Sequence, residues 1–393
     1  MNAAWRAVVA AVCFVIVWRA VEVNLVLHDT DGHVAYPARD FTRPVAQLDV
    51  LRQAVRENPA NAAAYTMIAL GLEADADNAG AARAYQSARQ VAPVNQDNLA
   101  AMADFLLRHG DVPQALDVLA ALVAEYSDVR ARAFAVMGET LASGKYAAQW
   151  QAIVASSPTW LGSFIETACR SGTDPAALAP LFLQRVAQRE AQPAEGACII
   201  ERMRDTGRWT EAYQVWLNTL PRERLNDVGY IFNGSFEYAP LPGGFDWIVD
   251  RRPLREAAHA VDFAHTTGSV GQRALRVLYQ SEKRQSGMPV AQYLALPPGR
   301  YQVSGLARPE AMKDGRGAQW TLRCAAGGKP QEPLAHSVRF TGSGEWEPFS
   351  FDASIPAGCA GQVLQLEPSG AGASDQFLAG TLWFDNLSMR QYH

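Results

Sequence analysis

The residues that most often carry catalysis are scattered through this sequence and are not gathered into motifs. The seven histidines form no HExxH pair and the five cysteines form no CxxC pair, so close metal-ligand spacing is absent from the sequence. No GxSxG, P-loop or GxGxxG stands in the strand-turn-helix order that its chemistry requires. Nothing marks a carboxylate pair of the kind that glycosidases use. The sequence therefore predicts a non-enzymatic protein; a glycan-active enzyme of unfamiliar type is an alternative that a paired-carboxylate cleft would support.

The cysteines carry a different chemistry, because they can cross-link the chain. Cys13 lies in an apolar N-terminal stretch, and the other four fall as two pairs in the two halves of the chain. In an oxidising compartment the simplest pairing is Cys169–Cys198 and Cys324–Cys359, one of the three connectivities that four cysteines allow. In a reducing compartment the same residues would be small buried hydrophobic side chains.

The N-terminal segment bears on the compartment. Residues 7–18 are continuously apolar, and the apolar character extends to Leu27 if Arg19 reaches back to the membrane surface. That length of about 21 residues is enough to cross a bilayer. Arg6 precedes the segment and acidic residues follow it, which favours a cytoplasmic N-terminus. Because no small-residue cleavage site follows, we expect residues 1–27 to be an uncleaved signal-anchor, with a cleaved signal peptide as the alternative.

Length and composition indicate two or three globular domains. The chain has 393 residues, of which 49% are hydrophobic and 19% charged, so it is not expected to be disordered. Its net charge of -5 gives no reason to expect a nucleic-acid partner. Residues 28–43 are polar and aperiodic, which is typical of a linker.

Residues 44–227 show a repeat of about 34 residues. Pro59 and Pro93 each end a helical pattern at this spacing, and small residues recur at matching positions, as at Ala69 and Ala103. The pattern resembles the tetratricopeptide repeat, in which alanines let paired helices cross closely. We expect about five helical hairpins here, the middle ones degenerate.

From residue 228 onward the hydrophobic period changes from 3.6 to 2. Stretches such as 300–308 and 318–324 alternate, and Gly/Pro turns separate them. About eight to ten short strands predict an antiparallel sandwich or jelly roll over residues 228–393. Alternation places Trp320 on the same face as Leu322, so we expect it in the core.

The two ends of this second region carry a paired signature. It opens with "IFNGSFE" (231–237) and closes with "LWFDNLSM" (382–389). This pair resembles the carbohydrate-binding-module β-jelly rolls that are appended to bacterial polysaccharidases. The resemblance covers residues 231–390 and rests on short motifs in the correct order.

The resemblance implies two kinds of site. Glu237 and Asp385 would converge where the first and last strands meet, and in such modules this place often holds a structural Ca²⁺; the alternative is that both carboxylates accept hydrogen bonds from turn amides. Glycans would stack on aromatic rings, for which the candidates are Trp247, Tyr279 and Tyr293. Trp247 follows a glycine pair, where exposure is expected.

Together these features predict a multidomain α + β protein: a membrane helix, an α-solenoid of tetratricopeptide type and a C-terminal β-sandwich. Similar combinations accompany bacterial exopolysaccharide or O-antigen assembly. We therefore expect an inner-membrane adaptor with most of the chain in the periplasm, which binds protein partners through its helices and polysaccharide through its jelly roll. The alternative is a purely structural protein–protein scaffold whose jelly roll no longer binds glycan.

Overall fold

The computed structural model describes residues 44–392 with short gaps at 253, 268, 281–283, 286–287, 314–316, 327–328 and 371–376. The predicted signal-anchor (1–27) and linker (28–43) lie outside the described residues. Within the described part, none of the helices has both the length and the apolar character needed to span a membrane. Contacts divide the chain into two compact units, residues 1–160 and 161–393.

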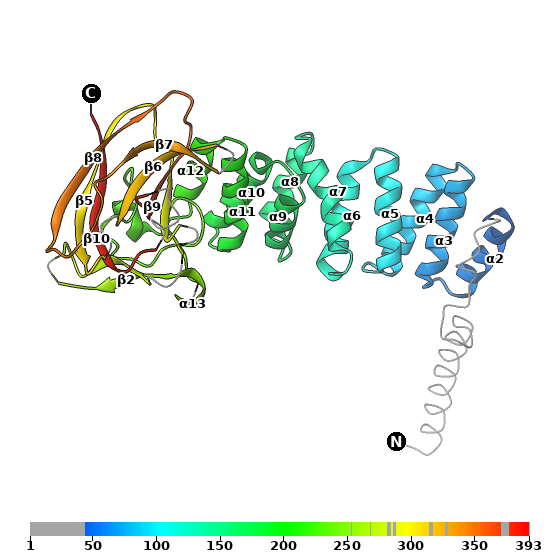
Figure 1. The fold of residues 1–393 in the computed structure, drawn as a ribbon. Helices are drawn as coiled ribbons and strands as arrows, with labels where there is room; N and C mark the ends of the chain where they lie inside the picture. Colours follow the sequence, from blue (N-terminus) through cyan, green and yellow to red (C-terminus); the bar gives the residue numbers. More distant parts are fainter. Residues whose placement is uncertain are drawn as a thin grey trace, which may run out of the picture. The chain divides into compact units, whose positions relative to one another are not determined.

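The described part of the first unit is helical, and its consecutive helices pack against one another (Figure 1). Short loops join them, as expected for neighbouring helices that run in opposite directions. The helices are α2 (Pro44–Glu57), α3 (Ala62–Ala74), α4 (Asn78–Val91), α5 (Gln96–Arg108), α6 (Val112–Glu125), α7 (Arg130–Ala142) and α8 (Ala147–Ala155).

The caps of these helices repeat with the predicted period. Asn61 and Asn95, 34 residues apart, each accept a backbone amide hydrogen of the first turn of α3 and α5. Asp77 and Asp111 do the same for α4 and α6 at the same spacing. Such caps satisfy amides that a helix leaves without a partner. The alanines that align in the repeat are buried at Ala69, Ala81, Ala103 and Ala115. The resemblance to a tetratricopeptide superhelix itself stays a prediction.

The second unit begins with four more helices, α9 (Leu161–Arg170), α10 (Pro175–Ala187), α11 (Pro193–Asp205) and α12 (Trp209–Leu217), followed by a 3₁₀ turn at Arg222–Asp227. A disulfide joins Cys169 of α9 to Cys198 of α11, with the two Cα atoms 6.3 Å apart. The first of the two predicted pairings is therefore present in the structure.

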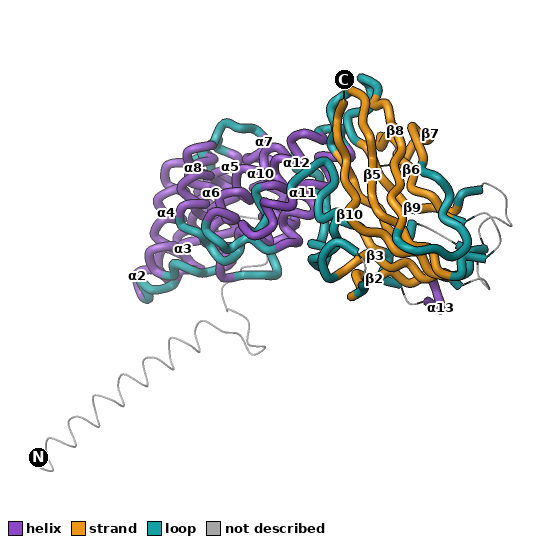
Figure 2. Tube along the Cα trace, turned by 90° about the vertical axis from the view of Figure 1, so that its left-hand side faces the viewer, coloured by secondary structure: helices purple, strands orange, loops and turns teal. Residues whose placement is uncertain are grey.

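The rest of the second unit is a β-sandwich of two five-stranded antiparallel sheets (Figures 1 and 2). One sheet has the order β1-β4-β9-β6-β7, and the other has the order β2-β3-β10-β5-β8. The strands are β1 (Ile248–Val249), β2 (His259–His265), β3 (Arg273–Tyr279), β4 (Val290–Leu294), β5 (Gly299–Glu310), β6 (Ala318–Ala326), β7 (Lys329–His336), β8 (Glu347–Ile355), β9 (Gln362–Pro368) and β10 (Gly380–Tyr392); a short helix, α13 (Leu254–Ala257), precedes β2.

Aromatic side chains from both sheets fill the space between them. Trp320 of β6 is fully buried, as its alternation predicted, and its ring packs against Phe384 of β10 with centroids 5.2 Å apart. Trp247 also contacts Trp320, with ring centroids 5.8 Å apart. The second predicted disulfide, Cys324–Cys359, links β6 to the loop before β9. The predicted sandwich and both predicted cysteine pairings are thus confirmed.

The two signature segments of the β region meet in space. The carbonyl of Gly234 accepts a hydrogen bond from the amide of Leu387, which lies within an irregularity of β10 between Asp385 and Ser388. A Cβ on Gly234 would lie 1.9 Å from the Leu387 carbonyl oxygen, so only glycine fits there. The N-G-S-F-E opening and the final strand therefore lie directly against each other, as the paired signature predicted.

The helices α9–α12 belong to the same compact unit as the sandwich, so the predicted boundary at residue 228 separates types of secondary structure and not compact units. Trp209 of α12 packs against Tyr293 of β4, with ring centroids 5.8 Å apart. Gly361 lies beneath Trp209, where a Cβ would come within 2.0 Å of the indole. Close packing of large rings on glycine holds the helices against the sandwich.

A buried ion pair reinforces this joint. Asp246 is almost completely buried, and its carboxylate lies 3.6 Å from the guanidinium of Arg224 in the 3₁₀ turn. The same carboxylate accepts amide hydrogens from Leu241 and Trp247. Burial raises the pKa of Asp246, which these hydrogen bonds and Arg224 oppose.

Replacing Gly244 by alanine should loosen this joint. Gly244 has a φ of 74°, and a Cβ there would lie 2.1 Å from Cδ1 of Trp216. Gly342 is a matched control, because its φ is 72° and its Cβ position is open. Left-handed strain alone costs about 1 kcal/mol, so Gly342→Ala should lose about that much stability. Gly244→Ala should lose about 2–4 kcal/mol, because the tryptophan must also move.

Denaturant unfolding of the full chain, followed by tryptophan fluorescence, measures both losses. Equal losses in the two variants would contradict the packing of α12 on the sandwich.

Candidate functional site

Two of the three aromatic residues predicted to bind sugar are buried. Trp247 is 2% exposed and Tyr279 is 3% exposed. Trp247 packs on Phe236 and Trp320, and its indole nitrogen donates to the carbonyl of Asn233. A ring that stacks on a sugar must reach solvent, so the expected exposure of Trp247 is wrong, and neither ring can serve as a platform as it lies. The hydrogen bond and the aromatic contacts draw Trp247 inward although it follows two glycines.

Tyr293, the third candidate, lies in β4 where the sandwich meets α12. It is half-buried, and the guanidinium of Arg204 lies 4.1 Å from its ring centre. Burial lowers the pKa of Arg204, and the same guanidinium donates to the carbonyl of Gly244. Tyr293 is thus held in place by α11 and α12 and faces a cavity that is described below.

Glu237 and Asp385 converge on one segment, as predicted. Asp385 accepts the amide hydrogen of Val270 at 2.6 Å and that of Asn386 at 2.7 Å. One oxygen of Glu237 accepts the amides of Gln272 and Arg273, at 2.8 and 3.0 Å. Both carboxylates therefore hold the turn that leads into β3.

These contacts determine how well the pair fits calcium. Both oxygens of Asp385 and one oxygen of Glu237 face N–H donors, whereas calcium wants six to eight oxygen ligands. Across the described residues, no group of three or more His, Cys, Asp or Glu side chains is placed to hold a metal. The donor set does not fit calcium as it lies, and it matches the alternative of hydrogen bonds to turn amides. Calcium stays a prediction without structural support.

A candidate binding surface lies on the outward side of the sheet β2-β3-β10-β5-β8. Strand register places outward residues of β10, β5 and β8 in rows across the sheet. One row is Ser388–Ser304–Ser350, and the next is Arg390–Gln302–Asp352. We call these six residues the polar face; all are exposed or half-exposed. Figure 2 shows the strands that carry them side by side.

Shallow cavities mark the same surface. One of about 470 Å³ is lined by Ser304, Ser350, Asn386 and Ser388, and another of about 380 Å³ is lined by Asp352 and Arg390. Both cavities include Gln302, so they adjoin. Hydroxyl and amide groups are among the residues that line both.

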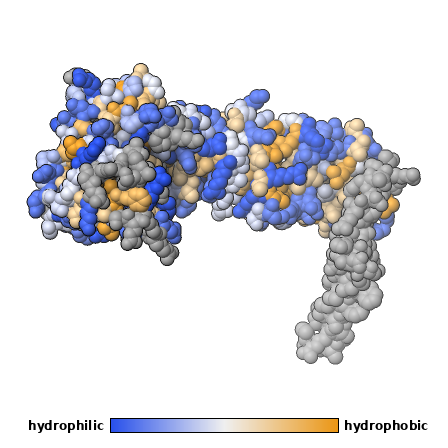
Figure 3. Space-filling view, viewed as in Figure 1, coloured by the Kyte–Doolittle hydropathy of each residue, from blue (hydrophilic) through white to orange (hydrophobic). Residues whose placement is uncertain are grey.

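The polar groups on this face are already oriented by one another. Ser304 and Ser388 lie within hydrogen-bond distance, with their hydroxyl oxygens 3.1 Å apart. The amide of Gln302 donates to Asp352 at 3.4 Å. The space-filling view of the molecule has hydrophilic and hydrophobic residues interspersed over the sandwich (Figure 3). The polar face therefore offers fixed donors and acceptors to a neutral ligand.

A ladder of arginines and tryptophans crosses the same side of the sheet at one end of the polar face. Arg276 donates to Asp262 at 2.8 Å, and its guanidinium lies 5.5 Å from the Trp383 ring centre. Arg308 lies 4.9 Å from Trp383 and 5.0 Å from Trp346. Stacked cations and rings of this kind are favourable and rigid. The ladder fixes the end of the polar face and leaves Trp383 almost completely covered.

A histidine–carboxylate pair lies elsewhere in the sandwich. His259 of β2 contacts Asp250 at 3.0 Å and Gln285 at 3.0 Å, and it is fully buried. The Arg252 guanidinium beside Asp250 holds the pKa of that carboxyl at about 2. With its side chain buried between Asp250 and Gln285, His259 cross-links the segments around β2.

The polar face is not predicted from the sequence, although part of its pattern is present there. The stretch 300–308 is predicted to be a strand, and its alternation separates Gln302 and Ser304 from buried Tyr301 and Val303. Single polar residues on one strand do not indicate a site. Only the pairing with β8 and β10 brings them together.

No protein-family model and no curated protein matches this chain. Solved structures that are similar include carbohydrate-binding modules with β-sandwich folds. A CBM4 structure is 15% identical, covers 41% of this chain and 99% of its own, and has a TM-score of 0.30. The CBM22-1 xylan-binding domain from Paenibacillus barcinonensis is 14% identical and covers 40% of this chain and 91% of its own, with a TM-score of 0.27. TmCBM61 in complex with β-1,4-galactotriose is 16% identical and covers 42% and 99%, with a TM-score of 0.26. At these identities no residue role transfers to this chain.

The titration of Asp385 gives a test of the carboxylate pair. Burial, with a smaller contribution from Glu237, raises the pKa of Asp385 from 3.8 to about 6. Folded Asp385 therefore holds its proton more tightly than unfolded Asp385, and the stability this supplies is present below about pH 4 and is lost as the pH rises through about 6. Asp385→Asn removes this titration. The melting temperature of the variant minus that of wild type should therefore increase from pH 4 to pH 7, because only wild type loses this stability.

Asp352→Asn, which makes the same change at an exposed position of the same sheet, is the control for the substitution itself. A melting-temperature difference between Asp385→Asn and wild type that does not change with pH would contradict the raised pKa of Asp385. Calcium added at pH 7 tests the metal in the same samples, because an ion held by these carboxylates would raise the melting temperature of wild type and not of Asp385→Asn.

Proposed function

We propose that the second unit binds an extended, uncharged polysaccharide along the polar face and that the chain serves as a non-enzymatic adaptor for glycan handling at a cell envelope. One observation carries the proposal: two rows of oriented hydroxyl, amide and charged groups cross three strands and line adjoining cavities of about 470 and 380 Å³.

The chemistry of these groups suits a sugar chain. A polysaccharide presents many hydroxyls along its length, each of which can donate and accept hydrogen bonds. Serine hydroxyls and the Gln302 amide can do the same, and ordered water can bridge wider gaps. Each such bond contributes only about 0.5–1.5 kcal/mol, so a ligand must contact many of them to bind well. An extended ligand on a flat sheet meets that condition, whereas a small molecule does not.

Charge also favours a neutral ligand. Several acidic and basic groups on this side of the sheet have partners on the same sheet: Gln302 donates to Asp352, and Arg276 pairs with Asp262. Arg308 pairs with Glu310 at 2.9 Å. An acidic polysaccharide would have to displace these partners, so we expect it to bind more weakly than a neutral one.

The adaptor role rests on the helical part of the chain. Helical hairpins with a 34-residue spacing of caps support a repeat surface for a protein partner. In this proposal the predicted N-terminal anchor holds the chain at the bacterial inner membrane with its bulk in the periplasm, where a partner in the same bilayer is met at a raised effective concentration. Exopolysaccharide or O-antigen assembly is the setting that the sequence suggested.

The triple variant Gln302→Ala/Ser304→Ala/Ser388→Ala tests the proposal in the full chain. It removes three groups of the polar face without touching the core. We expect it to weaken binding to a neutral bacterial polysaccharide by at least about tenfold, because three hydrogen bonds are lost. Binding is measured by calorimetry or by retardation in gels that contain each polysaccharide of a neutral and acidic panel.

The control carries the same residue changes in the first unit, Gln90→Ala/Ser87→Ala/Ser127→Ala, and should bind like wild type. Melting temperatures of both variants should stay close to that of wild type. Equal affinity of the two triple variants would contradict the polar face as the site. If no polysaccharide in the panel binds to wild type, the glycan part of the proposal is wrong and the purely structural scaffold is favoured.

A further inference from the structure

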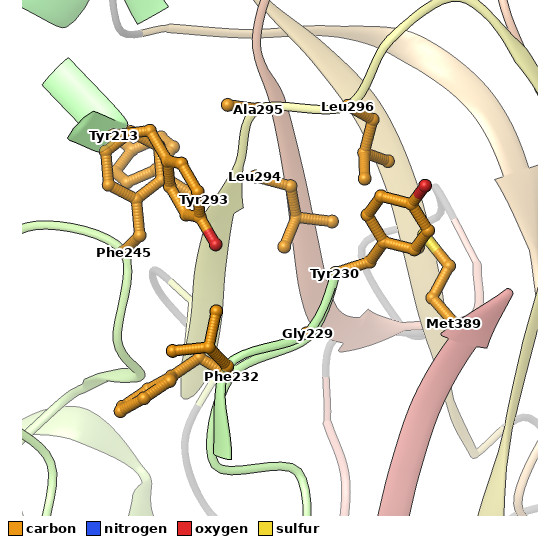
Figure 4. Close-up of a pocket in the computed structure, with 11 residues that line it drawn as sticks. Tyr213, Gly229, Tyr230, Phe232, Phe245, Tyr293, Leu294, Ala295, Leu296 and Met389 are labelled. Atoms are coloured by element: carbon orange, nitrogen blue, oxygen red, sulfur yellow. The ribbon is translucent and has the colours of Figure 1, made fainter. Parts of the chain in front are cut away.

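Another cavity lies at the end of the sandwich, where the two sheets open toward α12. Its volume is about 330 Å³. We call it the tyrosine pocket and define it by Tyr213, Tyr230, Tyr293, Leu294, Leu296 and Met389. Figure 4 shows Tyr213 and Tyr293 on one side, Tyr230 with Met389 and Leu296 on the other, and Leu294 between them.

Residues outside the pocket pack against two of its tyrosine rings. Tyr293 has the Arg204 guanidinium 4.1 Å from its ring centre and Trp209 at 5.8 Å. Tyr230 packs edge-on against buried Tyr301 with centroids 5.4 Å apart, yet it is 39% exposed. The pocket is thus largely formed before a ligand arrives, so that binding loses less side-chain conformational entropy.

The lining selects against charge and against a fully hydroxylated sugar. None of the residues that line it carries a charge, and apart from the tyrosines their side chains are apolar. Burying many hydroxyls here would leave them without partners, which is costly. A group with an apolar methyl and a single carbonyl fits better, because the methyl can rest on Leu294 and Leu296 while a tyrosine hydroxyl donates to the carbonyl.

The pocket is connected to the polar face. The hydroxyl of Tyr230 donates to the side-chain oxygen of Gln391 at 3.3 Å. Gln391 also lines the cavity of about 380 Å³ that contains Gln302 and Asp352.

Met389 of the pocket lies between Ser388 and Arg390 of the polar face in β10, so the pocket is on the inner side of that strand and the polar face on its outer side. A chain that leaves the polar face past Gln391, near the end of β10, therefore reaches Tyr230, and a substituent of that chain is placed to enter the pocket.

We infer that the tyrosine pocket accepts the acetyl group of an acetylated sugar unit in the polysaccharide that lies on the polar face. This inference rests on the proposed function and adds the substituent that the site selects. Tyr230 supplies an exposed ring for the sugar, and the aliphatic floor supplies the contact for the methyl group. A proline-rich peptide would also suit tyrosine rings, but the connection through Gln391 favours a glycan.

The test uses the full chain and one O-acetylated bacterial polysaccharide, before and after mild alkali removes its acetyl groups. Wild type should bind the acetylated form about tenfold more tightly. Tyr230→Ala should bind both forms alike, at the affinity that wild type shows for the deacetylated form. Tyr230→Phe is the matched control, because it keeps the ring and loses only the hydroxyl bond to Gln391, and it should keep most of the preference.

Three results would overturn the inference. One is equal binding of the two forms by wild type, and another is an equal loss for both forms in Tyr230→Ala. The third is a proline-rich peptide that binds wild type and is lost in Tyr230→Ala while acetylation has no effect. If the polar-face triple variant loses polysaccharide binding while acetylation makes no difference, the inference fails and the proposed function stands. If neither form binds at all, both fail.

Discussion

The position of β10 in its sheet is the constraint on which the rest of the second unit depends. This strand, the last of the chain, pairs with both β3 and β5 and so lies in the middle of five strands. Its inner face contributes Phe384 to the core, and its outer face contributes Ser388 and Arg390 to the polar face. Because Gly234 binds the amide of Leu387, the first segment of the β region is anchored to the last strand. Core and candidate surface therefore both depend on the position of β10.

The sandwich does not stand alone, because helices complete it. Trp209 and Trp216 of α12 pack against Phe245, and glycines at 244 and 361 make room for their rings. The buried contact of Arg224 with Asp246 adds a specific polar link at the same joint. This packing closes the end of the sandwich and forms the tyrosine pocket, so the pocket is a property of the whole second unit and not of a β-sandwich by itself.

Two chemistries lie side by side on this unit. The polar face presents hydroxyl, amide and charged groups, some of which are oriented by hydrogen bonds, and the tyrosine pocket presents rings and aliphatic carbons. A plain polymer of hydroxyls satisfies only the first, and an apolar ligand satisfies only the second. A glycan with an apolar substituent matches both, which is why selectivity is expected to depend on the ring of Tyr230, which lies beside Gln391.

Local patterns in the sequence determined the element types, the 34-residue spacing of the caps and the burial of Trp320, because each depends on residues close together in the chain. The two cysteine pairs could be predicted because four cysteines allow only three connectivities. The resemblance carried by the two signature segments implied that Glu237 and Asp385 converge. Tertiary structure decided the burial of Trp247, since its partners Phe236 and Trp320 come from separate segments. It alone assembled the polar face, because register across β10, β5 and β8 is set by pairing between strands far apart in the chain, and no single strand carries that information.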